Sequence, residues 1–125
     1  MEKNNRKEFS GPERRQYKRL KVFHLAVPIQ INAENIGSVI PGILLDISAG
    51  GIGILSFKEI PINTVVNLQI VLHNIKTDII KAKVVWVKQV EKTYRIGFQF
   101  TEISKKDFEQ ISIYVEKHLM EDFYL

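Results

Sequence analysis

The sequence predicts an all-β domain with one C-terminal helix, in the form of a six-stranded antiparallel β-barrel. Six short stretches carry apolar residues at every second position, and turn residues separate them at intervals of about 8–12 positions. After Thr101 the apolar spacing changes to three and four residues, which is the period of a helix. A chain of 125 residues is long enough for one domain with a substantial core.

The strands follow from this two-residue alternation. Pro28 has no N–H to donate to a ladder, so we expect an edge position or a bulge in the first strand. Trp86, Phe98 and Phe100 fall on the inward phase of their strands and are expected in the core. The six expected strands cover residues 23–31, 38–47, 52–56, 66–73, 77–88 and 93–100.

A helix is expected over residues 105–120. Ser104 is a suitable N-cap, and Asp107 three residues later forms a weaker version of a capping box. The apolar stripe that would face the barrel consists of Phe108, Ile111, Val115 and Leu119. The predicted organisation is a flexible lead-in (1–12), a barrel domain (13–103) that includes an arginine loop (13–20), and the helix packed on the barrel (104–120).

The composition excludes several classes of protein. There are no cysteines, and no stretch of 18 apolar residues predicts a membrane span. The polar N-terminus predicts no signal peptide, so we expect a cytoplasmic protein. The three histidines (His24, His73, His118) lack the spacing of metal ligands, and no catalytic or phosphate-loop motif occurs. We therefore expect a non-enzyme without metal or cofactor.

Positive charge is confined to the start of the chain. Residues 1–21 contain eight basic and three acidic side chains, a net charge of +5, whereas residues 22–125 contain ten basic and eleven acidic ones, a net charge of −1. A protein that binds duplex DNA normally spreads cations over a whole face. The local excess suits a small anion better than nucleic acid.

Four cations occupy six positions from Arg14 to Arg19, with Tyr17 among them. A guanidinium is planar and always charged, and its fork of donors fits a phosphate or a guanine edge. Arg15 and Arg19, four residues apart, can close on one anionic ligand, although the stretch is also compatible with a solvated basic tail. Tyr17 is compatible with two roles, stacking on a base or an arginine, or anchoring this segment to the barrel.

The second stretch with ligand chemistry is the turn from Asp46 to Gly51. By strand alternation Asp46 and Ser48 point to the same side, and the glycines that follow allow left-handed or tight backbone angles. A carboxylate can accept from the N1–H and exocyclic amine of guanine, while arginine complements O6 and N7. The structural alternative is a serine turn that caps its own backbone.

The two stretches together closely resemble the PilZ domain family. Arg-x-x-x-Arg at Arg15 and Arg19 is followed by Asp-x-Ser-x-x-Gly at Asp46, Ser48 and Gly51, and the later stretches 84–87 and 94–98 agree as well. The resemblance covers residues 12–103. It implies a barrel that binds cyclic di-GMP, with Arg15 and Arg19 on phosphates and guanine edges. Asp46 and Ser48 would hold a guanine or phosphate, Gly51 would permit the turn, and Arg14 would assist.

The resemblance implies a cyclic di-GMP receptor that relays its signal to a protein partner. In this family such partners often belong to motility, pilus or exopolysaccharide machinery, and the sequence selects none of them. Two alternatives remain open at this point. One is a protein-interaction adaptor with the same barrel that does not depend on nucleotide, and the other is a barrel that binds nucleic acid.

Overall fold

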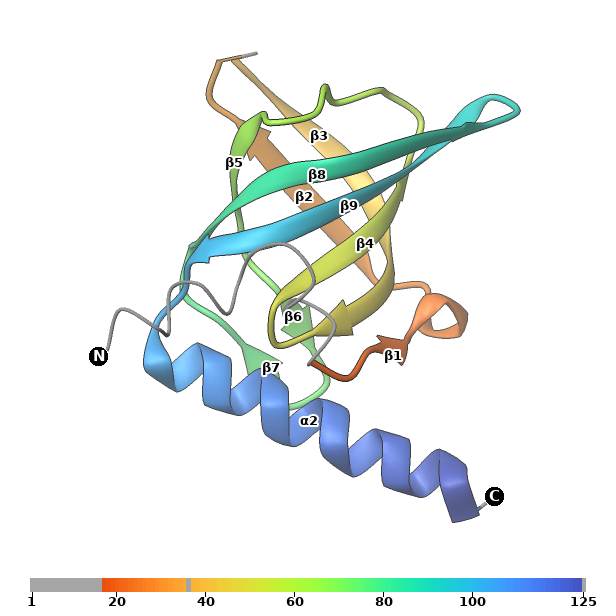
Figure 1. The fold of residues 1–125 in the computed structure, drawn as a ribbon, viewed down its shortest axis with the longest axis vertical. Coiled ribbons are helices and arrows are strands. Elements are labelled where there is room, and N and C mark those ends of the chain that lie inside the picture. The colour runs from red at the N-terminus through yellow and green to blue at the C-terminus, as the bar shows by residue number, and fades with distance from the viewer. Residues whose placement is uncertain (1–16, 36, 125) are drawn as a thin grey trace.

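Six strands close into an antiparallel barrel in a computed structural model that describes residues 17–35 and 37–124, with side chains described as far as Met120. In the order in which they pair, the strands are β3 (Ser38–Ser48), β2 (Pro28–Ala33), β5 (Val65–Leu68), β8 (Ile80–Val90), β9 (Thr93–Glu102) and β4 (Gly51–Ser56). Pairing of β4 with β3 closes the ring. The predicted fold class, a six-stranded antiparallel barrel with one C-terminal helix, is confirmed (Figure 1).

The start of the chain differs from the prediction of one long strand over 23–31. A two-residue strand, β1 (Leu20–Lys21), pairs with β3, and a 3-10 turn, η2 (Phe23–Leu25), follows it. Ala26 takes a left-handed backbone conformation with φ 54°, which ends the turn and separates it from β2. Pro28 is the first residue of β2 and lies beyond the β5 pairing, so its missing N–H costs no ladder bond on that side.

The predicted fourth strand is interrupted after β5. The hydroxyl of Thr77 accepts the N–H of Ile70 at 3.0 Å, and the side-chain amide of Gln69 donates to the carbonyl of Thr77 at 2.7 Å. These bonds replace ladder partners, so the chain leaves the barrel here. It forms a separate hairpin of β6 (Val71–Leu72) and β7 (Ile75–Lys76), which pair with each other.

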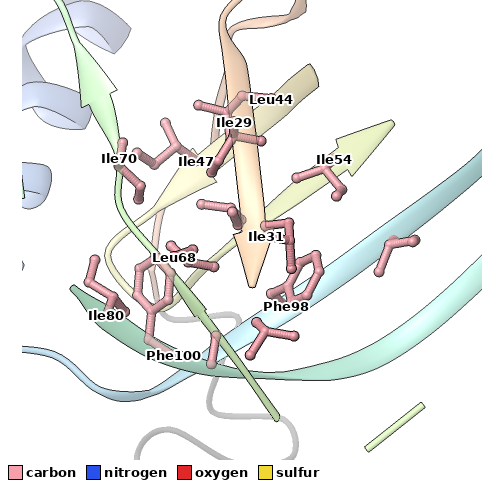
Figure 2. Packing of buried hydrophobic residues seen from close by; sticks show 14 of the residues in the cluster. Ile29, Ile31, Leu44, Ile47, Ile54, Leu68, Ile70, Ile80, Phe98 and Phe100 are labelled. Carbon is pink, nitrogen blue, oxygen red and sulfur yellow. The ribbon is translucent and has the colours of Figure 1, made fainter. Parts of the chain in front are cut away.

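The barrel interior is filled by aliphatic side chains from all six strands together with Phe98 and Phe100 (Figure 2). The expectation for Phe98 and Phe100 is therefore confirmed, but the expectation for Trp86 is wrong, because this residue is 41% exposed. The register of β8 against β9 shifts between Val84 and Trp86, so Val85 is an extra residue. One extra residue reverses the alternation, and Trp86 therefore lies on the outer surface.

Helix α2 (Lys105–Tyr124) contacts β1, β3 and β7 and lies across one end of the barrel (Figure 1). Ser104 caps it as predicted, since its hydroxyl accepts the N–H of Asp107 at 3.1 Å. The carboxylate of Asp107 accepts the N–H of Asp78 at 2.9 Å, which ties the helix start to the chain before β8. In the described part of the chain no helix is long and apolar enough to cross a membrane.

Candidate ligand-binding site

The first motif meets the second at the pairing of β1 with β3. Arg14 and Arg15 lie outside the described residues, but Arg19 directly precedes β1. Leu20 is opposite Ile47 in this pairing, which places Arg19 beside the end of β3. One guanidinium nitrogen, Nη1, lies 2.6 Å from Oδ1 of Asp46. Two segments that are 27 residues apart in sequence therefore form one charged surface.

A β-bulge positions the carboxylate of Asp46. Leu44 is opposite Ile54 and Asp46 is opposite Gly53, so Leu45 is the extra residue in β3. The carboxylate lies against the backbone of Gly53, because a Cβ atom at Gly53 would be 2.9 Å from Oδ1 of Asp46. The Asp46 side chain is 24% exposed, and the Arg19 side chain is 46% exposed. The ion pair is thus at the surface, where a ligand can reach both partners.

The hydroxyl of Ser48 holds the turn between β3 and β4. It accepts the N–H groups of Gly50 and Gly51, both at 3.2 Å, and Ser48 is only 2% exposed. This is the serine turn that the sequence left open as an alternative. In this state the hydroxyl of Ser48 stabilises the loop that carries the site.

The glycine requirement at Gly51 has a different cause from the one expected. Gly37 is the only described glycine with a positive φ, so neither Gly50 nor Gly51 uses the left-handed region. A Cβ at Gly51 would lie 2.0 Å from the carbonyl oxygen of Phe98 on the neighbouring strand. Gly51 is needed because β4 and β9 approach closely at this point.

Tyr17 anchors the N-terminal segment in this structure. Its ring contacts the backbone of Gly50, where an added Cβ would lie 2.8 Å from Cδ2 of the ring. The same ring meets Phe108 of α2 edge to face, with centroids 5.7 Å apart. Of the two roles considered for Tyr17, the anchoring role matches these contacts.

Trp86 lies beside this candidate site, although strand alternation assigned it to the core. Its indole lies across Gly97 of β9, since a Cβ at Gly97 would be 2.1 Å from Nε1. Asp46, Gly53, Gly97 and Trp86 are successive partners across four strands, β3, β4, β9 and β8. The carboxylate and the indole therefore flank a pair of glycines on the outer face of the barrel. The signal in the sequence was Gly97, because a glycine inside a strand often marks a close approach.

Two hollows in the surface adjoin these four cross-strand partners, and Trp86 lines both hollows. The first borders the turn, with Arg19, Ser48 and Gly51 among its residues. The second has a volume of about 350 Å³ and is lined by Lys21, Phe23, Leu45, Asp46, Leu55, Trp86 and Arg95. The surface thus offers cations, a carboxylate and an exposed aromatic ring, which match a ligand that combines anionic groups with planar polar rings.

The histidines do not contribute to this surface. His24 is in η2, His73 is in the turn between β6 and β7, and His118 is on α2 with its ring Nδ1 2.9 Å from the carbonyl of Tyr114. Within residues 17–35 and 37–124, no group of three His, Cys, Asp or Glu side chains forms a metal-binding cluster.

Solved structures of other proteins share this fold. The PilZ domain of YcgR from Escherichia coli, solved with c-di-GMP, has a TM-score of 0.67 at 19% identity. The match covers 87% of this chain and 96% of the YcgR domain. The inhibitor of motility MotI/DgrA from Bacillus subtilis has a TM-score of 0.70 at 20% identity, with coverage of 85% and 51%. The MrkH–c-di-GMP complex from K. pneumonia has a TM-score of 0.72 at 16% identity, with coverage of 87% and 54%.

This chain therefore spans about half the length of MotI/DgrA and of MrkH. None of the curated proteins matches it. The sequence model of the PilZ domain matches residues 13–117, which is most of the chain and includes both motifs. The chain belongs to the PilZ domain family.

Proposed function

We propose that this domain binds cyclic di-GMP on the surface formed by the arginine stretch, the β3–β4 turn and Trp86. The observation that carries the proposal is the contact between Arg19 and Asp46 at 2.6 Å. A guanine presents O6 and N7 on one edge and N1–H and an amine on another. A guanidinium and a carboxylate in one surface provide donors for the first edge and an acceptor for the second.

Each motif residue has a role in the proposal. Arg15 and Arg19 bind phosphates and guanine edges, and Arg14 adds positive charge beside them. Asp46 accepts from guanine, while Ser48 and Gly51 keep the turn in the conformation that presents the backbone of the site. Trp86 adds an exposed indole on which a base can stack, an interaction worth roughly 1–3 kcal/mol per base.

The domain then acts as a sensor whose bound state is recognised by another protein. One protein of similar fold is an inhibitor of motility, which favours motility machinery as the partner class. The family resemblance adds pilus and exopolysaccharide machinery as further partner classes. A receptor for an internal second messenger works in the cytoplasm, and a chain without cysteine is compatible with that compartment.

Calorimetric titration with cyclic di-GMP tests the proposal. Arg15→Ala and Asp46→Ala each remove a charge-assisted contact worth about 1.5–3 kcal/mol, so each variant should bind roughly 10- to 150-fold more weakly. Lys92→Ala is the matched control, because Lys92 is an exposed cation in the turn between β8 and β9. Its affinity should equal that of the parent.

The same titration separates the alternative functions. Absence of heat with cyclic di-GMP in the parent protein would favour the adaptor that does not depend on nucleotide. Tight binding of an unrelated oligonucleotide, with a steep dependence on salt, would favour the nucleic-acid barrel. Equal affinity in both variants and the control would remove Arg15 and Asp46 from the site.

A further inference from the structure

The segment between the two motif arginines is attached to both the turn and the C-terminal helix. Tyr17 lies halfway between Arg15 and Arg19 in the chain, and its ring is inserted between Gly50 and Phe108. The two aromatic rings meet at an interplanar angle of 83°, an edge-to-face geometry that favours attraction. Tyr17 thus connects the β3–β4 turn with the first turns of α2.

Lys18 extends the attachment along the helix. Its Nζ lies 3.1 Å from Oε2 of Glu116, eight residues and about two turns after Phe108. Tyr17 and Lys18 also line one hollow of about 190 Å³ with Ala49, Ser112, Val115 and Glu116. We use the name Tyr17 clasp for the set Tyr17, Lys18, Gly50, Phe108 and Glu116.

The aromatic contact carries most of this attachment. The side chains of Lys18 and Glu116 are 66% and 58% exposed, so their ion pair is solvated and contributes little. Tyr17 is half-buried against a backbone and a second ring. The clasp therefore depends on Tyr17 and Phe108 far more than on the charges.

The clasp restricts where the arginines can be. Two residues of extended chain span at most about 7 Å, so fixing Tyr17 keeps the backbone of Arg19 close to the turn that carries Ser48 and Gly50. A segment that is already held in place loses less conformational freedom when a ligand binds. The clasp is thus expected to strengthen binding without touching the ligand.

We infer that Tyr17 is a positioning residue for the arginine stretch and that the clasp couples ligand occupancy to the packing of α2. The inference rests on the proposed function of the site. Coupling is reciprocal, so if the clasp strengthens ligand binding, bound ligand must strengthen the contact between Tyr17 and Phe108 by the same free energy. The face of α2 that carries Phe108 and Glu116 then differs between the empty and the occupied domain.

The clasp itself is tested without ligand by limited trypsin digestion. Phe108→Ala removes the ring that holds Tyr17, so cleavage after Lys18 should become about 3- to 10-fold faster. Ile113→Ala is the matched control, since Ile113 is an apolar residue of the same helix that is 68% exposed. Equal cleavage rates in the two variants would show that Phe108 does not hold the segment.

Binding of cyclic di-GMP tests the positioning role. Tyr17→Ala should weaken binding about 3- to 10-fold, and Tyr17→Phe, which keeps the ring contact with Phe108, should weaken it much less. Gly50→Ala should act through the same contact, because its methyl group displaces the ring of Tyr17. In the Tyr17→Ala background Gly50→Ala should therefore have no further effect, a non-additivity that a purely local distortion of the turn would not produce.

Hydrogen exchange in α2 completes the test. Cyclic di-GMP should slow exchange of amides in residues 108–116 of the parent, and Tyr17→Ala should abolish that slowing while the protein stays folded by circular dichroism. A parent that binds the ligand with no change in α2, or a Phe108→Ala variant with unaltered affinity, would overturn the coupling. If the parent binds no cyclic di-GMP, but Phe108→Ala is still cleaved faster than Ile113→Ala, the clasp is supported and the proposed function is refuted.

Discussion

Replacing Gly53 by alanine is a sharp test of how the site is built. The added Cβ would lie 2.9 Å from Oδ1 and 3.1 Å from Oδ2 of Asp46, so the carboxylate must move away from its position beside Arg19. Gly53 does not have a positive φ, and alanine is therefore compatible with the backbone. The substitution moves one functional group without removing any atom from the motifs.

The expected effect of Gly53→Ala on stability follows from the solvent exposure of the Arg19–Asp46 ion pair. The Arg19–Asp46 pair is partly exposed, so its loss should lower the free energy of unfolding by less than about 1 kcal/mol. If the displaced carboxylate no longer accepts from guanine, binding should weaken by about 1.5–3 kcal/mol, or roughly 10- to 150-fold in Kd. Affinity and stability should therefore respond very differently to Gly53→Ala.

Calorimetry with cyclic di-GMP measures the affinity, and urea denaturation measures the stability. Gly42→Ala is the opposite control, because its Cβ would lie 3.0 Å from Cδ1 of Ile54 and from the carbonyl oxygen of Leu55. It should destabilise the fold by about 1–3 kcal/mol while the affinity of the folded protein stays unchanged. Parent-like affinity in Gly53→Ala would refute the role assigned to the Asp46 carboxylate.

Three further predictions concern other parts of the molecule. Trp86→Ala should weaken cyclic di-GMP binding by about 1–3 kcal/mol, and the fluorescence of this single tryptophan should change on ligand addition in the parent; unchanged emission at saturation would argue against stacking. Ser48→Ala leaves two buried turn amides without their acceptor and should lower the free energy of unfolding by about 1–3 kcal/mol, as measured by urea denaturation. Ser38→Ala, at an exposed position, is the control and should leave the stability unchanged. Asp107→Ala removes the acceptor of the Asp78 N–H and should cost a similar amount by the same assay, and a variant as stable as the parent would contradict that assignment.

Much of the fold was accessible from the sequence because the barrel follows a two-residue period. Phe98 and Phe100 are buried as that period requires, and Ser104 caps the helix through a local hydrogen bond. The prediction that Trp86 is in the core failed because a bulge at Val85 changes the alternation of β8. The energy of a bulge depends on the partner strand, so a local sequence pattern does not reveal it. The strand predicted from Phe23 failed for a related reason, since Ala26 adopts a left-handed conformation that its residue type does not signal.

The site was accessible in part. Arg19, Asp46 and Ser48 were identified as residue types suited to a guanine dinucleotide, and the pairing of β1 with β3 brings Arg19 and Asp46 together. The role of Gly53 depends on cross-strand register, which the sequence does not specify by itself. The contact of Tyr17 with Phe108 joins residues 91 positions apart and was accessible only from the folded chain.

The location of the ligand can be observed directly by NMR. In a ¹H–¹⁵N correlation spectrum, the single indole N–H belongs to Trp86 and gives one resonance. Cyclic di-GMP should shift this resonance together with the amides of Ser48, Gly51 and Gly97, and the cyclic dinucleotide with adenine bases should not. Saturable binding that leaves these signals in place and shifts only amides of β2 and β5, on another part of the barrel, would contradict the account.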